Sequence, residues 1–177
     1  MANLQERILR AAKLDPSIYE EVEADETAMG QATAVVVLSS VAAGIGTIPQ
    51  GGVIGILIGT LAALLSWYVW AYLTYWIGTK LLPEATTEAT AGQLLRTLGF
   101  ASAPGLIRVI GILPGLAELV FLIAAVWMLI AMVIAVRQAL DYTSSLRAVG
   151  VCAIGFVVQV AMLAMLFSLV GGPTPAR

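Results

Sequence analysis

Five long apolar runs, separated by short polar stretches, dominate the pattern of hydrophobic and polar positions along the chain. Each run approaches or exceeds the roughly 20 residues that a helix needs to cross ~30 Å of hydrocarbon. Since a backbone in lipid must satisfy its own hydrogen bonds, the pattern predicts an all-α, polytopic membrane protein. The predicted transmembrane helices cover residues 30–48, 53–82, 94–113, 115–136 and 148–170.

A polar region precedes the first predicted span. Apolar residues recur at helical spacing over residues 4–12, which predicts a short amphipathic helix at the membrane surface. Asp15 is a typical N-cap for a second short helix ending near Glu23, and Asp25 is expected to cap the helix that continues into the first span. The expected regions are an N-terminal segment at 1–29, a five-helix domain at 30–170 and a short outer tail at 171–177.

Composition and charge predict where the protein resides and how it is oriented. With 60% hydrophobic and 11% charged residues, the chain lies far from the average soluble protein. The first 29 residues contain no apolar core, so we expect no cleavable signal peptide and a cytoplasmic N-terminus. A C-terminus outside then satisfies the positive-inside rule, and we expect a bacterial inner membrane and, with dispersed basic residues, no nucleic-acid partner. This topology places on the cytoplasmic side Arg7, Arg10, Lys13, Lys80, Arg96, Arg137 and Arg147, and outside Arg177.

Small residues recur at a regular interval in the second predicted span. They fall every four positions, which places them in one smooth stripe along a helix. Because small residues let two helices approach closely, the stripe predicts a packing face, either against a neighbouring span or across a homodimer. The residues of this small-residue stripe are Gly51, Gly55, Gly59 and Ala63.

The other end of the second span is rich in aromatic residues. Tryptophans and tyrosines cluster within residues 67–76, where an aromatic belt at the headgroup level is the ordinary interpretation. The alternative is a binding surface for a lipid or a prenyl chain. The candidate lipid-contact residues are Trp67, Trp70, Tyr75 and Trp76.

The residues available for chemistry argue against an enzyme. The chain contains no histidine, which excludes serine–histidine catalysis and most zinc sites. No two aspartates lie within the predicted spans, so a paired-aspartate protease is excluded as well. The one cysteine, Cys152, is expected to be a small buried hydrophobe. We therefore expect no catalytic residue, no cofactor and no metal.

Ionisable and polar residues within the spans are the remaining candidates for function. Arg108 and Glu118 flank one predicted outer turn at similar depth, so we predict an ion pair that joins the third and fourth spans. A proton or ion relay and independent snorkelling are the alternatives. Gln159, in the fifth span, needs a hydrogen-bond partner on another helix.

Pro104 is expected to interrupt the third span. It has no amide to bond one turn back, which predicts a kink near residues 100–102, with Ser102 compensating. A re-entrant third run is the alternative. It would place Arg137 and Arg147 outside, against the positive-inside rule, so we expect five full spans.

Several segments resemble the Yip family of small five-span membrane proteins, named for interaction with Ypt/Rab GTPases, and in particular its bacterial branch. They are RAAKLDPSIYEEVEAD at residues 10–25, GFASAPGL at 99–106, and VWMLIAMVIAVRQAL with SSLRA at 126–148. The resemblance implies a cytoplasmic N-terminus and a non-catalytic role in membrane organisation or, in eukaryotic members, vesicle traffic. GTPase binding is not carried over, because DPSIY matches the family's Asp-Leu-Tyr-Gly-Pro element only loosely. The candidate docking face for a cytoplasmic protein partner is Asp15, Tyr19, Glu20 and Glu23.

Together these features predict a non-enzymatic membrane scaffold that organises the bilayer or recruits partners through its N-terminal segment. The expected partners are the lipid bilayer, a second copy of the chain, and a cytoplasmic protein. One alternative is a small transporter or channel whose polar path uses Arg108, Glu118 and Gln159. The other alternative is a lipid or prenyl-chain binder that uses the aromatic half of the second span.

Overall fold

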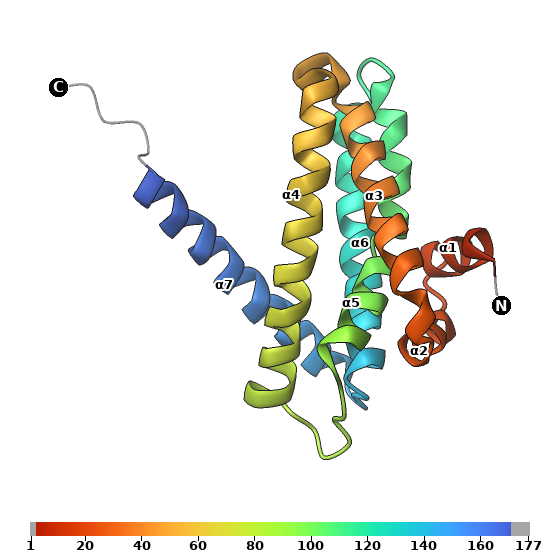
Figure 1. Cartoon of the computed structure of the whole chain (residues 1–177), viewed down its shortest axis with the longest axis vertical. Coiled ribbons are helices and arrows are strands. Elements are labelled where there is room, and N and C mark those ends of the chain that lie inside the picture. Colours follow the sequence, from red (N-terminus) through yellow and green to blue (C-terminus); the bar gives the residue numbers. More distant parts are fainter. Residues whose placement is uncertain (1–2, 171–177) are drawn as a thin grey trace.

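A computed structural model describes residues 3–170, which form helices joined by short turns (Figure 1). The chain begins with two short helices, and its third span is divided into an α-helix and a 3-10 helix. The elements are α1 (Leu4–Ala12), α2 (Pro16–Ala24), the 3-10 turn η1 (Glu26–Ala28), α3 (Met29–Gly46), α4 (Ile48–Trp76), the π-helix η2 (Ile77–Leu81), α5 (Ala91–Phe100), the 3-10 helix η3 (Ala103–Ile112), α6 (Ala117–Ala139) and α7 (Ser145–Val170).

Five helical segments of the described chain are long and apolar enough to cross a membrane, which confirms the predicted all-α, five-span class. The segments lie close to the five apolar runs of the sequence. They are Glu26–Gly46, Gly52–Leu81, Ala91–Ile112, Ala117–Ala139 and Ser145–Met162.

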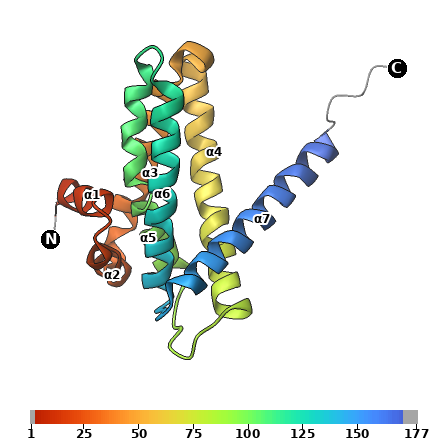
Figure 2. The same ribbon diagram turned by 180° about the vertical axis from the view of Figure 1, so that it is seen from behind.

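The spans form a bundle from which the last helix diverges. Both ribbon views show α3, α4, η3 and α6 standing side by side, whereas α7 leaves the bundle at an angle (Figures 1 and 2). The contacts of α7 are with α6, α4 and η2. As a result the α4 span has none of its most apolar window buried, although it is the longest of the five.

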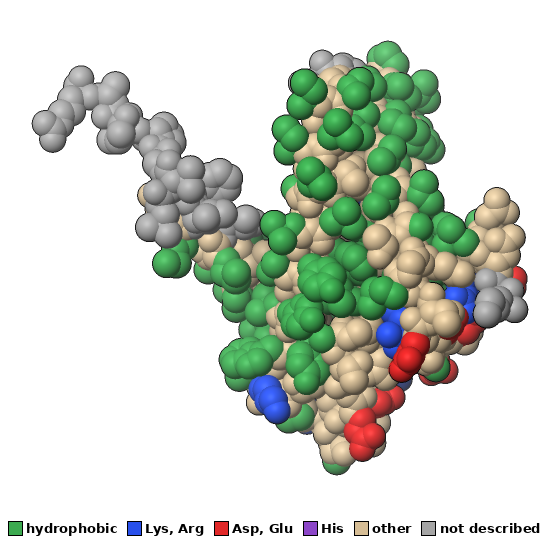
Figure 3. Space-filling model, viewed as in Figure 1, with side chains coloured by type: hydrophobic (Ala, Val, Ile, Leu, Met, Phe, Trp, Pro, Cys, Tyr) green, Lys and Arg blue, Asp and Glu red, His purple; other side chains and the backbone are tan. Residues whose placement is uncertain are grey.

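Charged side chains gather at one end of the bundle (Figure 3). This end, which we call the charged end, carries α1, α2 and the connections at residues 82–90 and 140–144 (Figure 1). The positive-inside rule predicts that it is the cytoplasmic end. The predicted outer tail at 171–177 lies outside the described residues.

The N-terminal helices fold back onto the charged end. Asp15 caps α2 and Asp25 caps η1, as the sequence predicts. Arg7 is buried and donates hydrogen bonds to Glu21 at 2.9 Å, to Asp25 at 2.8 Å and to Gln31 of α3 at 3.0 Å. Because an arginine removed from water needs such partners, α1 and α2 belong to the folded body of the protein.

The third span is interrupted ahead of Pro104. The helix α5 ends at Phe100, and the chain resumes as η3 at Ala103. Pro104 cannot donate to the carbonyl one turn back, and the Ser102 hydroxyl donates to the Gly99 carbonyl at 2.6 Å. The interruption therefore lies where the proline predicts it, and the 3-10 winding of the following ten residues is the part that the sequence did not indicate.

Glycines allow α3 to lie directly against the third span. A side chain on Gly99 would collide with Ala32 of α3, and a side chain on Gly46 would collide with the Arg108 carbonyl oxygen. The backbones are therefore closer than two ordinary side chains permit, which is how membrane helices gain van der Waals contact. By contrast, a side chain on Gly59 of α4 would meet no atom within 4 Å.

Replacing Gly46 by alanine should destabilise the protein, because the new methyl group meets a backbone carbonyl that cannot move alone. We expect a loss of about 1–3 kcal/mol, as for other overpacked sites, and a thermal midpoint several degrees lower in detergent. The matched variant Gly59→Ala should keep or slightly raise the midpoint, since alanine favours helix. Equal midpoints for the two variants would contradict the close approach of α3 and η3.

Candidate functional site

A cavity of ≈ 600 Å³ lies among the spans, and side chains from α3, α4, both halves of the third span, α6 and α7 line it. Its size falls within the range of small-molecule and cofactor sites. Most of the wall is apolar. The polar and aromatic residues that line it are Ser39, Ser40, Ser66, Trp67, Trp70, Ser102, Arg108, Phe156 and Gln159.

Arg108 is half-buried and points from η3 toward α3. Its Nε donates to the Gly105 carbonyl at 3.0 Å, and its Nη2 donates to the carbonyl and the hydroxyl of Ser39 at 3.0 and 2.8 Å. The guanidinium carbon lies 5.9 Å from the centre of the Phe121 ring, within reach of a cation–π interaction. A side chain on Gly105 would occupy this space, because it would collide with the Ser39 hydroxyl, the Arg108 guanidinium and the Met128 sulfur.

The predicted ion pair between Arg108 and Glu118 is wrong. Arg108 bonds to α3, and Glu118 is exposed in the first turn of α6, where a carboxylate is favoured by the helix dipole. Similar depth on adjacent helices does not fix the direction of a side chain about its helix axis, and on the 3-10 helix η3 the guanidinium reaches Ser39 of α3.

Gln159 finds the interhelical partner that the sequence predicts. Its amide nitrogen donates to the Ser66 hydroxyl of α4 at 2.9 Å. Gln159 and Arg108 both line the cavity, but Glu118 does not. The three residues of the predicted polar path are therefore not brought together. Glu118, the acidic residue of that path, is absent from the cavity wall, which argues against the transporter alternative.

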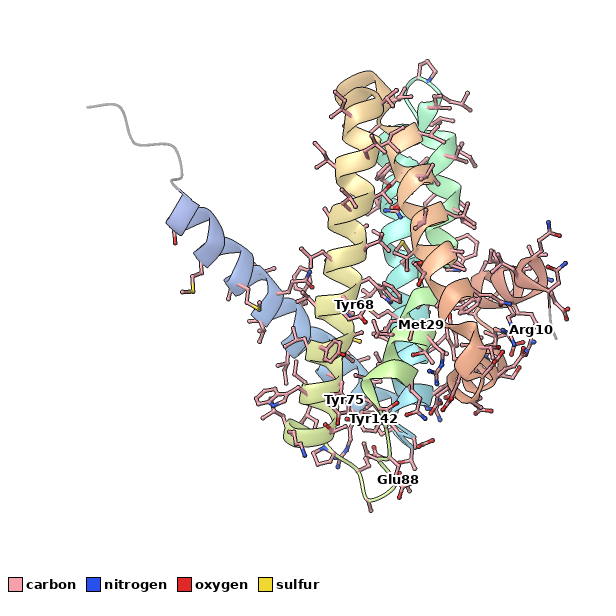
Figure 4. All side chains as sticks on the ribbon, viewed as in Figure 1. Arg10, Met29, Tyr68, Tyr75, Glu88 and Tyr142 are labelled. Atoms are coloured by element: carbon pink, nitrogen blue, oxygen red, sulfur yellow. The ribbon has the colours of Figure 1, made fainter. Side chains whose placement is uncertain are left out.

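The four aromatic candidates for lipid contact separate into different environments. Trp67 and Trp70 line the cavity, and the Trp67 indole donates to the Leu95 carbonyl of α5 at 3.1 Å. The Trp70 indole nitrogen is buried and has no hydrogen-bond partner among the described residues. Trp76 is exposed, whereas Tyr75 is partly buried at the charged end, near Tyr142 (Figure 4). An aromatic belt thus describes only part of the cluster.

The helical spacing of α4 contains a signal that could have located this wall of the cavity. One face of the helix carries positions i, i+3, i+4 and i+7, which here are Ala63, Ser66, Trp67 and Trp70. Residues of α3 such as Ser39 carry no such signal. A serine in an apolar helix is common, and only the neighbouring span shows that it receives a guanidinium.

The small-residue stripe of α4 has no packing partner at its centre within the chain. Side chains added at Gly55 or Gly59 would meet nothing within 4 Å. Ala63 lines the cavity, and the side-chain environment of Gly51 lies outside the described parts. The expected contact with a neighbouring span is therefore wrong at these two glycines, because α7 diverges from α4, and the homodimer alternative stays a prediction.

The predicted docking face of the N-terminal segment is partly used within the chain. Tyr19 is fully buried, and its hydroxyl donates to the Ala11 carbonyl at 3.5 Å. Glu20 accepts a hydrogen bond from Gln138 of α6 at 2.5 Å, and Asp15 forms an ion pair with Arg10 at 3.0 Å. Parts of the predicted docking face are therefore used within the chain, and docking of a protein partner there stays a prediction.

Glu23 lies at the centre of this contact between α2 and the spans. Its carboxylate accepts from the Gln93 amide at 2.9 Å, and Arg96 donates to the backbone carbonyls of Val22 and Glu23. Loss of hydration raises the pKa of Glu23 to about 7, with a further rise from nearby Asp141 and Glu20 that the charge of Arg96 partly opposes. The sequence did not indicate Arg96 as the residue that holds α2 to α5.

These observations define a polytopic helical membrane protein with five candidate spans and a partly polar cavity among them. The chain belongs to the Yip1 domain family, whose model matches residues 16–167. Members of this family are generally non-enzymatic membrane proteins. The match confirms the resemblance to the family, and the assignment to its bacterial branch stays a prediction. Comparison with curated proteins and with solved structures finds no match.

The raised pKa of Glu23 predicts a pH dependence of stability. The folded state binds this proton more tightly than the unfolded chain does, so stability should fall as pH rises from about 5 to about 8. We expect the thermal midpoint in detergent to drop by a few degrees over that interval. Asp25, whose pKa hydrogen bonds from Thr27 and Arg7 lower to about 2, titrates below this window.

The variant Glu23→Gln should flatten this slope, because an amide does not titrate and can still accept from Gln93. Glu26→Gln, which changes an exposed carboxyl nearby, serves as the control and should keep the wild-type slope. An unchanged slope in Glu23→Gln would rule out Glu23 as its source.

Proposed function

We propose that the protein is a non-enzymatic scaffold of a bacterial inner membrane, which organises the membrane by associating with a second copy of itself through α4. The observation that carries the proposal is the state of α4, whose most apolar window has no buried residue within the chain. Large apolar side chains are exposed along it, among them Val53, Ile54, Leu57, Ile58, Leu61 and Leu65. The outer side of α4 is therefore available to another helix.

The small-residue stripe supports helix association over simple lipid contact. In a bilayer, exposed apolar side chains alone give no preference for protein over lipid, because lipid tails are equally apolar. Glycines every four residues do give a preference, since they allow backbones to approach closely. Gly55 and Gly59 are open and lie on this uncovered helix.

The structure of the N-terminal segment also favours association within the membrane over recruitment of a cytoplasmic protein. Tyr19 is buried and bonds to Ala11 of α1, and Glu20 and Glu23 accept hydrogen bonds from Gln138 and Gln93 of the spans. Recruitment of a cytoplasmic protein by these residues would require α2 to detach. Association through α4 requires no such rearrangement.

The double variant Gly55→Leu/Gly59→Leu tests the proposal. Leucines at open positions should leave the monomer folded, because leucine is a better helix former than glycine and meets no neighbour. They should block close approach of a second helix, so we expect the dimer fraction in lipid nanodiscs to fall at least several-fold, measured by native mass spectrometry.

Leu57→Phe enlarges an exposed side chain on the opposite face of α4, because position 57 lies two residues, or about 200°, from each of the two glycines. It is the control and should leave the dimer fraction unchanged. A wild-type protein that is monomeric at every protein-to-lipid ratio would refute the proposal. So would a double variant that dimerises as well as the wild type does.

A further inference from the structure

The cavity has a positive charge that no carboxylate of residues 3–170 neutralises. Among these residues, Arg108 is the one charged side chain in its wall. Of the five ion pairs found within residues 3–170, four join residues of the N-terminal segment, and the fifth joins Glu84 to Arg147 in the first turn of α7, at the charged end. A charge held within the hydrophobic part of a membrane protein is costly unless it is paired. The geometry of the site therefore calls for an anion from outside the chain.

The hydrogen bonds of Arg108 leave part of the guanidinium available. They use Nε and Nη2, and Nη1 makes none within the described residues. Their acceptors are two carbonyls and one hydroxyl, which are neutral. These groups orient the guanidinium toward the cavity and satisfy some of its protons, but they do not cancel its charge.

The ring of Trp70 lines the same wall, but neighbouring atoms cover its indole nitrogen, which reaches a ligand only when the ring turns. This nitrogen has no partner among the described residues, which is an unfavourable state for a polar group away from water. The other polar contacts near it are already made, since the Gln159 amide donates to Ser66. A ligand that satisfies the cavity must therefore supply hydrogen-bond acceptors and a negative charge.

The rest of the wall indicates that this anion is attached to an apolar group. Leu98, Leu129 and Phe156 line the cavity together with Ala125, Met128 and Met132. Ala63 and Phe156 belong to α4 and α7, the two helices that diverge, and Leu65 of α4 and Phe156 and Val157 of α7 are exposed beside this opening. A molecule can therefore enter from the bilayer between these helices.

We propose that the cavity binds the anionic headgroup of a membrane lipid, with Arg108 as its counter-ion and the Trp70 indole, once its ring turns, as a second donor. The group recognised is a phosphate-containing headgroup whose net charge is negative. The acyl chains lie along the apolar wall and leave through the opening between α4 and α7. This site is separate from the glycines Gly55 and Gly59 of the proposed dimer contact, whose added side chains would meet open space.

The test compares two lipids on the delipidated full-length protein in detergent. Phosphatidylglycerol is the anionic probe and phosphatidylcholine is the zwitterionic one, and native mass spectrometry gives the dissociation constant for the first bound molecule of each. The wild type should bind phosphatidylglycerol on the order of tenfold more tightly, the effect of one hydrogen-bonded charge pair. The variant Arg108→Gln should bring the ratio of the two constants close to one.

Two further variants separate this site from general attraction of acidic lipids. Arg137→Gln removes an exposed arginine at the end of α6 by the same substitution and should keep the wild-type ratio. Trp70→Phe keeps an aromatic ring against α7 and removes only the indole donor, so it should weaken phosphatidylglycerol binding several-fold. It also tests the site if Arg108→Gln does not fold.

The proposal is overturned if the wild type does not prefer phosphatidylglycerol, or if folded Arg108→Gln and Trp70→Phe both bind it as the wild type does. A third measurement adds inorganic phosphate in excess to the wild-type complex. A lipid whose acyl chains also contact the apolar wall should remain bound. Displacement of the lipid by phosphate alone would identify a soluble anion as the occupant and overturn the lipid assignment.

Discussion

The structure of the bundle depends on how an arginine is accommodated within the third span. Arg108 receives no carboxylate from residues 3–170, so its donors reach carbonyls and a hydroxyl. This requires α3 to lie close enough for Ser39 to accept, and Gly46 and Gly105 remove the side chains that would prevent it. The interruption at Pro104 and the 3-10 helix that follows lead directly to this contact. One half-buried charge thus accounts for the close packing of α3 against the third span.

A second set of charges performs a structural role at the other end of the spans. The acidic N-terminal segment, which in the sequence resembles a surface for partners, is tied to the bundle by Arg7, Arg96 and Gln138. Polar contacts at the charged end therefore hold the ends of the helices together, in a region where water and lipid headgroups compete. Exposed apolar surface lies on α4, η3, α6 and α7. The proposed association with a second copy uses α4, and the proposed lipid site opens between α4 and α7.

Local features of the sequence predicted local features of the structure. The five spans, the caps at Asp15 and Asp25 and the interruption ahead of Pro104 were all predicted from short stretches of residues. Each depends on chain length, on a side chain that bonds to its own neighbouring backbone, or on a missing amide. The sequence also predicted that Gln159 bonds to another helix, and the structure identifies the partner as Ser66 of α4.

Amino-acid sequence alone determined that this chain crosses the membrane as helices, because hydrophobic length and backbone hydrogen bonding allow little else. Tertiary structure decided which side chains meet. The predicted pair of Arg108 with Glu118 and the predicted exposure of Tyr19 failed for the same reason. Contacts between helices depend on the rotation of each helix about its axis, and that rotation follows from winding and from neighbouring backbones that are distant in the sequence.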